Sequence, residues 1–224
     1  MFSPGNFNDN EDPMKCIIAA SGNLLSTPRI KRLLNEADLI IAADGGATHL
    51  RQMDISPHAI IGDMDSIHPD TKCFFEKKNI PIITHPSRKN QTDTDLCIEF
   101  AIKKGATTIT MLGVTGHRLD HTLANIFLLR KLCDLGVESR IIDANNEIYL
   151  VTDHLKLKGK KGDLLSVLPI SDKVTGLTLT GLEYPLENAA ISMGSSLGIS
   201  NYFKKRWVTI SILTGVLLVT KSKD

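Results

Sequence analysis

Short apolar segments that each end in a polar, glycine-containing loop are the feature that most restricts how this chain can fold. Residues 16–20 and 39–43 are continuous hydrophobic runs, of the length expected for strands that are buried on both faces. Segments of helical periodicity lie between such runs, and Thr27 followed by Pro28 supplies one of them with a cap and a first-turn residue. This alternation predicts an α/β domain with a doubly wound parallel sheet over residues 14–145. The expected strands are 16–20, 39–43, 59–61, 80–84, 108–112 and 137–142, and the expected helices begin near 28, 71, 93 and 123.

The pattern changes near Tyr149, where helical periodicity gives way to alternation of apolar and polar residues. Segment 208–212 is one example, and glycines recur between several short segments of this kind. Such alternation is typical of antiparallel strands with one buried face. We therefore predict a smaller, all-β domain of sandwich or barrel type over residues 146–224, with 214–215 as a hairpin turn. The polar segment 1–13 is expected to be a flexible tail.

The overall charge and hydrophobicity argue against two classes of partner. The chain has 26 Lys and Arg residues against 25 Asp and Glu, a net charge of +1, so we expect no nucleic acid partner. The apolar run 208–219 is shorter than the ~20 residues of a membrane span, and the N-terminus lacks the features of a signal peptide. We expect no membrane association and a cytoplasmic location. We expect the four cysteines to be buried free thiols, as in a protein of a reducing compartment. They are Cys16, Cys73, Cys97 and Cys133.

Two carboxylates follow the third expected strand. Residues 60–66 read Ile-Ile-Gly-Asp-Met-Asp-Ser, so an apolar run meets Gly62 and then Asp63 and Asp65. In an open α/β sheet, ligands bind at loops that follow the carboxyl ends of strands. The two carboxylates can coordinate a hard cation together with a phosphate substrate, or carry out acid–base chemistry. The alternative is a polar turn in which Asp63 and Ser66 cap the next element.

Four polar clusters lie at strand ends, and a doubly wound sheet brings such loops to one edge. They are residues 44–47, 63–66, 89–95 and 113–121. Carboxylates crowded at one edge repel one another and are most easily tolerated with Mg²⁺ between them. We expect Asp93 to be a ligand, whereas Asp95, three residues after Thr92, fits a capping box better.

The loop after the fifth strand has the composition of a phosphate site. Gly113 and Gly116 allow the backbone to approach a phosphate, and Arg118 at the start of a helix favours its negative charge. The spacing matches neither a Walker A motif nor a dinucleotide fingerprint. His121 alone would be interpreted as a helix-cap or core histidine, and Asn125 alone as a solvent-facing amide.

Taken together, five motifs in order resemble the thiamine pyrophosphokinase family, from about Met14 onward. They are Ala-Asp-Gly-Gly-Ala at 43–47, Ile-Gly-Asp-Met-Asp-Ser at 61–66, Gln-Thr-Asp-Thr-Asp at 91–95, Gly-x-x-Gly-x-Arg-x-Asp-His-x-Leu-Ala-Asn at 113–125, and Gly-Ile-Ser-Asn at 198–201. The resemblance implies Mg²⁺-dependent transfer of pyrophosphate from ATP to thiamine, which yields thiamine diphosphate and AMP. It also implies a homodimer with thiamine at the interface.

The matched positions imply a role for each of the following residues. ATP would be bound by Asp44, Gly45, Gly113, Gly116, Arg118, Asp120, His121 and Asn125, thiamine by Gln91, Thr92, Ser200 and Asn201, and Mg²⁺ by Asp63, Asp65 and Asp93, with Asp65, Asp93 and Arg118 as catalytic residues. Trp207, the single tryptophan, has no assigned role. Two other functions remain open. One is an aspartate-nucleophile phosphatase, whose opening motif resembles residues 63–66, and the other is a non-catalytic nucleotide or thiamine sensor.

Overall fold

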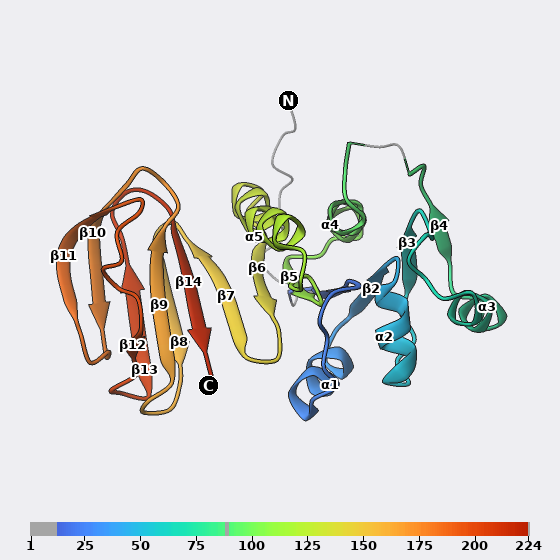
Figure 1. Cartoon of the computed structure of the whole chain (residues 1–224), viewed down its shortest axis with the longest axis horizontal. Helices are drawn as coiled ribbons and strands as arrows, with labels where there is room; N and C mark the ends of the chain where they lie inside the picture. The colour runs from blue at the N-terminus through green and yellow to red at the C-terminus, as the bar shows by residue number, and fades with distance from the viewer. Residues whose placement is uncertain (1–12, 88–89, 224) are drawn as a thin grey trace.

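The computed structural model describes residues 13–87 and 90–223, so the predicted tail lies outside the described residues except for Pro13. Strands and helices alternate through the first part of the chain (Figure 1). They are β1 (Lys15–Ala19), α1 (Pro28–Asn35), β2 (Leu39–Ala43), α2 (Gly46–Gln52), β3 (Ala59–Gly62), α3 (Pro69–Lys77), β4 (Ile82–Thr84), α4 (Asp93–Lys103), β5 (Thr108–Leu112), α5 (Leu119–Asp134) and β6 (Glu138–Ile142). Strands alone follow, namely β7 (Asn146–Val151), β8 (His154–Lys158), β9 (Leu164–Pro169), β10 (Lys173–Thr180), β11 (Leu186–Ser192), β12 (Asn201–Tyr202), β13 (Trp207–Ser211) and β14 (Leu217–Ser222).

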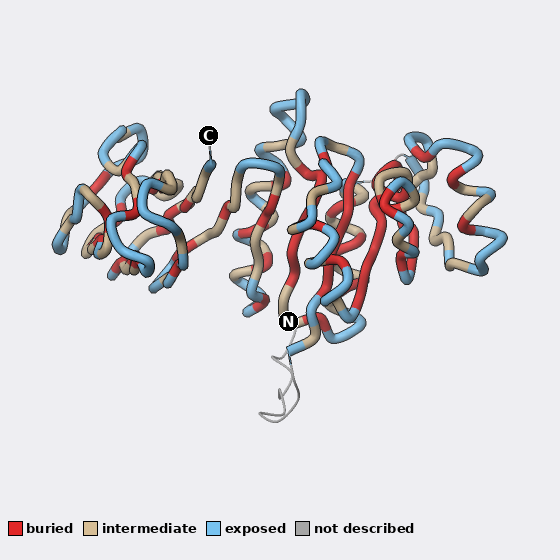
Figure 2. Tube along the Cα trace, turned by 90° about the horizontal axis from the view of Figure 1, so that it is seen from below, coloured by how far each residue is buried: buried red, intermediate tan, exposed pale blue. Residues whose placement is uncertain are grey.

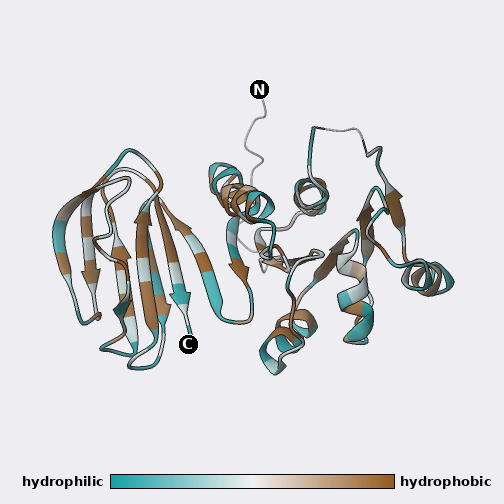
Figure 3. Ribbon diagram, viewed as in Figure 1, coloured by the Kyte–Doolittle hydropathy of each residue, from teal (hydrophilic) through white to brown (hydrophobic). Residues whose placement is uncertain are grey.

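The first part is a doubly wound parallel sheet, as the sequence predicts. β1 lies between β2 and β5, and the parallel order is β6-β5-β1-β2-β3-β4. One hydrophobic core lies between the sheet and helices α4 and α5, and a second lies between the opposite face and helices α1, α2 and α3. All five residues of β2 are buried because helices cover the sheet on both sides. β2 and β3, which lie inside the sheet, are accordingly drawn mainly in the hydrophobic colour (Figure 3).

The sheet continues beyond the predicted domain boundary at residue 145. β7 pairs antiparallel with β6, and the described sheet then extends through β14, β9 and β12, so its ten strands span both parts of the chain. A second sheet of order β11-β10-β13-β8 faces this extension, and a third core fills the space between the two sheets (Figure 1). The all-β part is therefore a sandwich that shares one sheet with the α/β part.

Several local predictions are wrong. Thr214 and Gly215 form no hairpin, because β13 belongs to the second sheet and β14 to the first. Cys73 is exposed and Cys133 half-buried, since each lies on an outward part of its helix, whereas the other two cysteines are buried. Helix α5 begins at Leu119, four residues before the expected start.

Buried residues lie along the sheet and on the helix faces that pack against it (Figure 2). Within the described residues, no helix has the length and hydrophobicity that crossing a membrane requires.

Candidate active site

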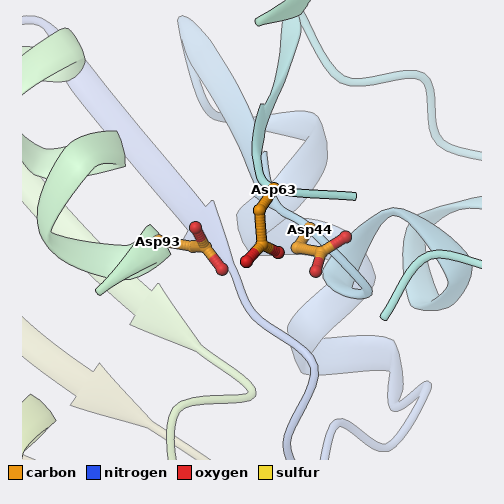
Figure 4. A group of neighbouring side chains, drawn as sticks. All are labelled: Asp44, Asp63 and Asp93. Atoms are coloured by element: carbon orange, nitrogen blue, oxygen red, sulfur yellow. The ribbon is translucent and has the colours of Figure 1, made fainter. Parts of the chain in front are cut away.

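Three carboxylates from three different elements meet at the edge of the sheet. Asp44 follows β2, Asp63 follows β3, and Asp93 is the first residue of α4. One oxygen of each lies within 4.8 Å of the other two, and Figure 4 shows the side chains converging. The observed cluster therefore contains Asp44 in place of Asp65, and the metal set predicted from the sequence differs from it by one member.

The ends of β2 and β3 are tied together at this point. The Asp44 backbone N–H donates to the Ile61 carbonyl at 2.9 Å, and the Ser66 backbone N–H donates to Asp44 Oδ2 at 3.0 Å. Asp44 has a φ of 44°, a left-handed conformation that aspartate tolerates better than most residues do. Gly62 leaves space for the cluster, because a Cβ there would lie 2.8 Å from the Asp44 Cβ and 3.2 Å from the Asp93 Cγ.

The environment of Asp44 disfavours its charged form. The pKa of Asp44 is raised to about 6, chiefly by burial and also by the carboxylates of Asp65 and Asp93, although the Ser66 hydrogen bond acts to lower it. Asp44 Oδ1 is buried and has no hydrogen-bond partner among the described residues. A buried, acceptor-only oxygen that lies near two further carboxylates suits a hard divalent cation, whose charge would offset the repulsion among the three groups. The residues present therefore fit Mg²⁺.

Asp65 lies beside this cluster. Its side chain is exposed, and its Oδ1 accepts a hydrogen bond from the Ser66 hydroxyl at 2.8 Å. Its backbone N–H donates to Asp63 Oδ1 at 3.4 Å across the turn after β3. Asp65 nevertheless lines the same cavity as Asp44 and Asp63.

A cavity of about 460 Å³ opens over the carboxylates. Its walls come from the loop after β1, the turn after β3, the start of α4 and the loop between β5 and α5. It brings together most of the site residues predicted from the sequence, namely Asp44, Asp63, Asp65, Gln91, Thr92, Asp93, Gly113, Gly116, Arg118, His121 and Asn125. The predicted residues Gly45, Asp120, Ser200 and Asn201 are not among those that line it.

The loop between β5 and α5 is held in place from two sides. Buried Asn125 donates from Nδ2 to the Val114 carbonyl at 2.9 Å, so the interpretation of a solvent-facing amide is wrong. The backbone N–H of Gly22 donates to the Gly113 carbonyl at 2.7 Å, which joins this loop to the one after β1. His49 in turn contacts the Gly22 carbonyl through Nε2 at 2.9 Å. The sequence alone does not point to Gly22 or His49, because neither belongs to a recognised motif.

Arg118 and Asp120 form an exposed pair at the mouth of the cavity. Arg118 Nη2 lies 2.5 Å from Asp120 Oδ2, and this hydrogen bond is the main reason why the pKa of Asp120 falls to about 2. His121 Nε2 lies 3.9 Å from the same carboxylate oxygen. An anion that binds Arg118 in the cavity must therefore first displace Asp120 from the guanidinium.

Thr92 caps helix α4, as predicted, because its hydroxyl accepts from the Asp95 backbone N–H at 3.3 Å. The capping box is incomplete. The Asp95 carboxylate instead contacts Lys131 Nζ of α5 at 2.5 Å and accepts from Gln91 Nε2 at 3.3 Å. Glu99 also contacts Lys131, at 3.6 Å. Lys131 and Glu99 were missed because the sequence does not reveal which residues of α4 and α5 face one another.

Ser200 and Asn201 differ in how they are used. Ser200 is exposed with a φ of 57°, and its backbone N–H donates to the Ser166 hydroxyl at 3.0 Å. Asn201 is buried, and its amide bonds the backbone of Tyr184 through both Oδ1 and Nδ2 and the backbone N–H of Tyr202 through Oδ1. Asn201 therefore holds the segment around Tyr184 against β12, while Ser200 is the more accessible of the two.

Two family models match the chain. One describes the catalytic domain of thiamin pyrophosphokinase and covers residues 30–141, and the other describes its vitamin B1 binding domain and covers residues 152–217. The chain belongs to the thiamine pyrophosphokinase family. It is 35% identical to the thiamine pyrophosphokinase of Bacillus subtilis (strain 168), in an alignment that covers 94% of this chain and 100% of the relative.

Solved structures of the thiamine pyrophosphokinase family share the fold. The crystal structure of the Bacillus subtilis thiamine pyrophosphokinase matches with a TM-score of 0.85 at 32% identity, covering 94% of this chain and 99% of that one. The Geobacillus thermodenitrificans thiamin pyrophosphokinase matches with a TM-score of 0.82 at 28% identity, covering 94% and 98%. The prediction of an enzyme of the thiamine diphosphokinase type is thereby confirmed.

The two family models divide the candidate site. The carboxylate cluster, the cavity over it and the β5–α5 loop as far as Asn125 fall within the catalytic match or its immediate surroundings, whereas Ser200 and Asn201 fall within the vitamin B1 binding match. Every residue that lines the described cavity lies between Ala20 and Asn125.

Proposed function

We propose that the chain transfers the diphosphoryl group of ATP to the hydroxyl group of thiamine with the help of Mg²⁺, producing thiamine diphosphate and AMP. The observation that carries this proposal is the convergence of Asp44, Asp63 and Asp93 beneath a cavity, with a buried carboxylate oxygen that no group of residues 13–87 and 90–223 satisfies. Membership of the thiamine pyrophosphokinase family supports it.

In the proposed reaction, the thiamine oxygen forms a bond to the β-phosphorus of ATP, and the bond from that phosphorus to the oxygen bridging it to the α-phosphate breaks. AMP leaves with that oxygen, and the hydroxyl proton passes to a carboxylate. Asp44, Asp63 and Asp93 would hold Mg²⁺, which supplies positive charge that offsets the charge of the phosphates. Asp65 and Asp93 both line the cavity, and either is a candidate for the proton acceptor.

The protein's own part is positioning and charge compensation, because phosphoryl transfer depends on these more than on a covalent nucleophile. The loop held by Asn125 and Gly22 offers backbone close to a phosphate, and Arg118 offers a guanidinium once Asp120 is displaced. Thr92 and Gln91 on the opposite wall are candidates for thiamine contacts.

We further propose that the enzyme acts as a homodimer, with thiamine bound between the cavity of one subunit and the Ser200 region of the other. The lining of the described cavity contains no residue after Asn125, although the vitamin B1 binding match begins at residue 152. A second copy would supply the missing wall of the site.

Measuring AMP and thiamine diphosphate from ATP, Mg²⁺ and thiamine tests the proposed reaction. Thiamine-dependent release of AMP in a one-to-one ratio with thiamine diphosphate is expected. Release of free phosphate regardless of thiamine would favour the aspartate-nucleophile phosphatase, and binding of thiamine without turnover would favour a sensor. Against the phosphatase, Asp63 follows the third strand of the chain rather than the first.

Mixing two inactive variants tests the shared site. One carries Asp93→Asn, and the other carries a Ser200→Trp substitution that fills the space beside the second wall. A heterodimer would contain one intact site, so random exchange restores about a quarter of the wild-type activity. If dimers shown to contain one copy of each variant recover no activity, a site built from two subunits is contradicted.

A further inference from the structure

A closed group of four side chains lies behind one wall of the cavity. Gln91 Nε2 donates to Asp95 Oδ2 at 3.3 Å and also to Glu99 Oε1. Lys131 Nζ, from the neighbouring helix α5, contacts Asp95 Oδ1 at 2.5 Å and Glu99 Oε1 at 3.6 Å. We call these four residues the Gln91 clamp. It joins the segment before α4, two turns of α4 and the middle of α5.

The chemistry of the clamp fixes which end of the Gln91 amide faces which way. An ionised carboxylate only accepts hydrogen bonds, so the NH₂ end of the amide must face Asp95 and Glu99. Two carboxylate partners occupy both N–H groups of that end. The amide oxygen is then the only hydrogen-bonding group that the Gln91 side chain can offer to another molecule.

Gln91 lines the cavity, whereas Asp95, Glu99 and Lys131 are not among its lining residues. Asp95 and Glu99 hold the amide nitrogen, which leaves the amide oxygen as the end of the side chain available to a ligand in the cavity. A hydrogen-bond acceptor in this position attracts an N–H or O–H donor and repels a carbonyl oxygen.

Lys131 makes this orientation stable. Two carboxylates that share one amide repel each other, and Lys131 compensates both at once. Burial lowers the pKa of Lys131, but the hydrogen bond and charge of Asp95 and the charge of Glu99 outweigh this effect and hold that pKa above its ordinary value. Lys131 is thus charged at neutral pH and can offset the repulsion between Asp95 and Glu99.

We propose that Lys131 is a positioning residue that acts through Asp95 and Glu99 to hold the Gln91 amide oxygen toward the cavity, so that the site selects a substrate with an N–H donor. This inference rests on the proposed function. Thiamine has such a donor, because its pyrimidine ring carries an exocyclic amino group. An analogue with an oxo group in place of that amine presents an acceptor there instead.

The first experiment compares kcat/KM for thiamine and for the oxo analogue, in wild type and in the Asp95→Asn/Glu99→Gln double variant. The variant keeps the shape of both side chains but lets each of them donate, so the Gln91 amide can present either end. We expect the preference for thiamine to fall about tenfold or more, which is the usual effect of removing an acceptor–acceptor mismatch. An unchanged preference would overturn the proposal.

The second experiment tests Lys131 itself. Lys131→Met is expected to raise KM for thiamine about tenfold while kcat changes less than about twofold, and Lys131→Arg should restore KM to within about threefold of wild type. Lys103→Met, which removes an exposed lysine from the last turn of α4, is the matched control. If Lys131→Met loses kcat/KM equally for thiamine and for the oxo analogue, and Lys131→Arg does not restore it, the role of Lys131 is purely structural and the proposal is contradicted.

Failure of the proposed function can be told apart from failure of the clamp. If wild type forms no AMP in response to thiamine, calorimetric binding of thiamine and the oxo analogue to wild type and to the double variant still measures the preference. A preference that the double variant loses supports the clamp, and equal binding of both compounds to wild type overturns it. If Lys131→Met does not fold, as judged by circular dichroism, the double variant carries the test.

Discussion

The backbone N–H of Ser66 donates to Asp44 Oδ2 at 3.0 Å, so the loop after β3 holds one oxygen of a carboxylate that follows β2. The other oxygen, Oδ1, is left buried and without a hydrogen bond among the described residues. Asp44 belongs to the carboxylate cluster with Asp63 and Asp93, whereas the exposed Asp65 lies outside it.

Substitution of the cluster should separate metal binding from proton transfer. Asp44→Asn and Asp93→Asn each remove one charge from the proposed ligand set, so the Mg²⁺ concentration that gives half-maximal activity should rise by about tenfold or more. Asp65→Asn should lower kcat without this shift if Asp65 accepts the proton. Titration of activity with Mg²⁺ measures both quantities, and Asp70→Asn on the exposed start of α3 is the control. A similar Mg²⁺ shift for Asp65→Asn would place Asp65 among the ligands after all.

Gly62→Ala should damage the cluster through a single methyl group. The new Cβ would lie 2.8 Å from the Asp44 Cβ and 3.2 Å from the Asp93 Cγ, so both carboxylates must move. We expect the free energy of unfolding to fall by about 1 to 3 kcal/mol and most activity to be lost. Urea denaturation and the AMP assay measure the two effects. Gly116→Ala, where the nearest atoms lie 3.8 Å away, should leave stability within about 0.5 kcal/mol of wild type.

Asn201 and Ser200 should respond differently to truncation. Asn201→Ala removes a buried side chain that bonds both the backbone N–H and the carbonyl of Tyr184, so we expect a loss of about 1 to 3 kcal/mol in the free energy of unfolding. Ser200→Ala at an exposed hydroxyl should cost less than about 0.5 kcal/mol. Chemical denaturation of both variants decides the matter, and equal stability losses would refute the structural role assigned to Asn201.

Glu147 should give the protein a stability component that depends on pH. Burial raises the pKa of Glu147, but a hydrogen bond from Tyr149 and the charges of Arg29 and Lys221 outweigh this, and the pKa lies below its ordinary 4.5. Because the folded pKa is depressed, the stabilisation is present above pH 4.5 and is lost as the pH falls through the folded value. Glu147→Gln should therefore flatten the decline of unfolding free energy below pH 4.5, which denaturation at pH 3 to 7 measures. A slope equal to that of wild type would contradict this.

The same carboxylate connects the two parts of the chain. Arg29 of α1 contacts Glu147 at 2.8 Å, and Lys221 of β14 contacts it at 3.5 Å. The sequence does not predict either contact, because Arg29, Glu147 and Lys221 are far apart in the chain and belong to no common motif. Charged pairs of this kind depend on which strands become neighbours in the sheet.

The sequence was sufficient for features that depend on local chemistry. Apolar runs of strand length placed β2 and β5 at their observed bounds, and Thr27 and Thr92 act as helix caps because each hydroxyl lies within reach of the next turn. The order of the five motifs along the chain was sufficient to identify the family. The alternation of strands with helices also placed the polar loops at one edge of the sheet, and the described cavity gathers most of them.

Tertiary structure alone decided what depends on distances between remote residues. It substituted Asp44 for Asp65 in the carboxylate cluster, joined the sandwich to the parallel sheet through β6 and β7, and brought Lys131 against Asp95. Local patterns determine which segments form strands, helices and polar loops, because those preferences act over a few residues. The rotation of a side chain within a turn and the pairing of helices and strands are determined only when the whole chain packs.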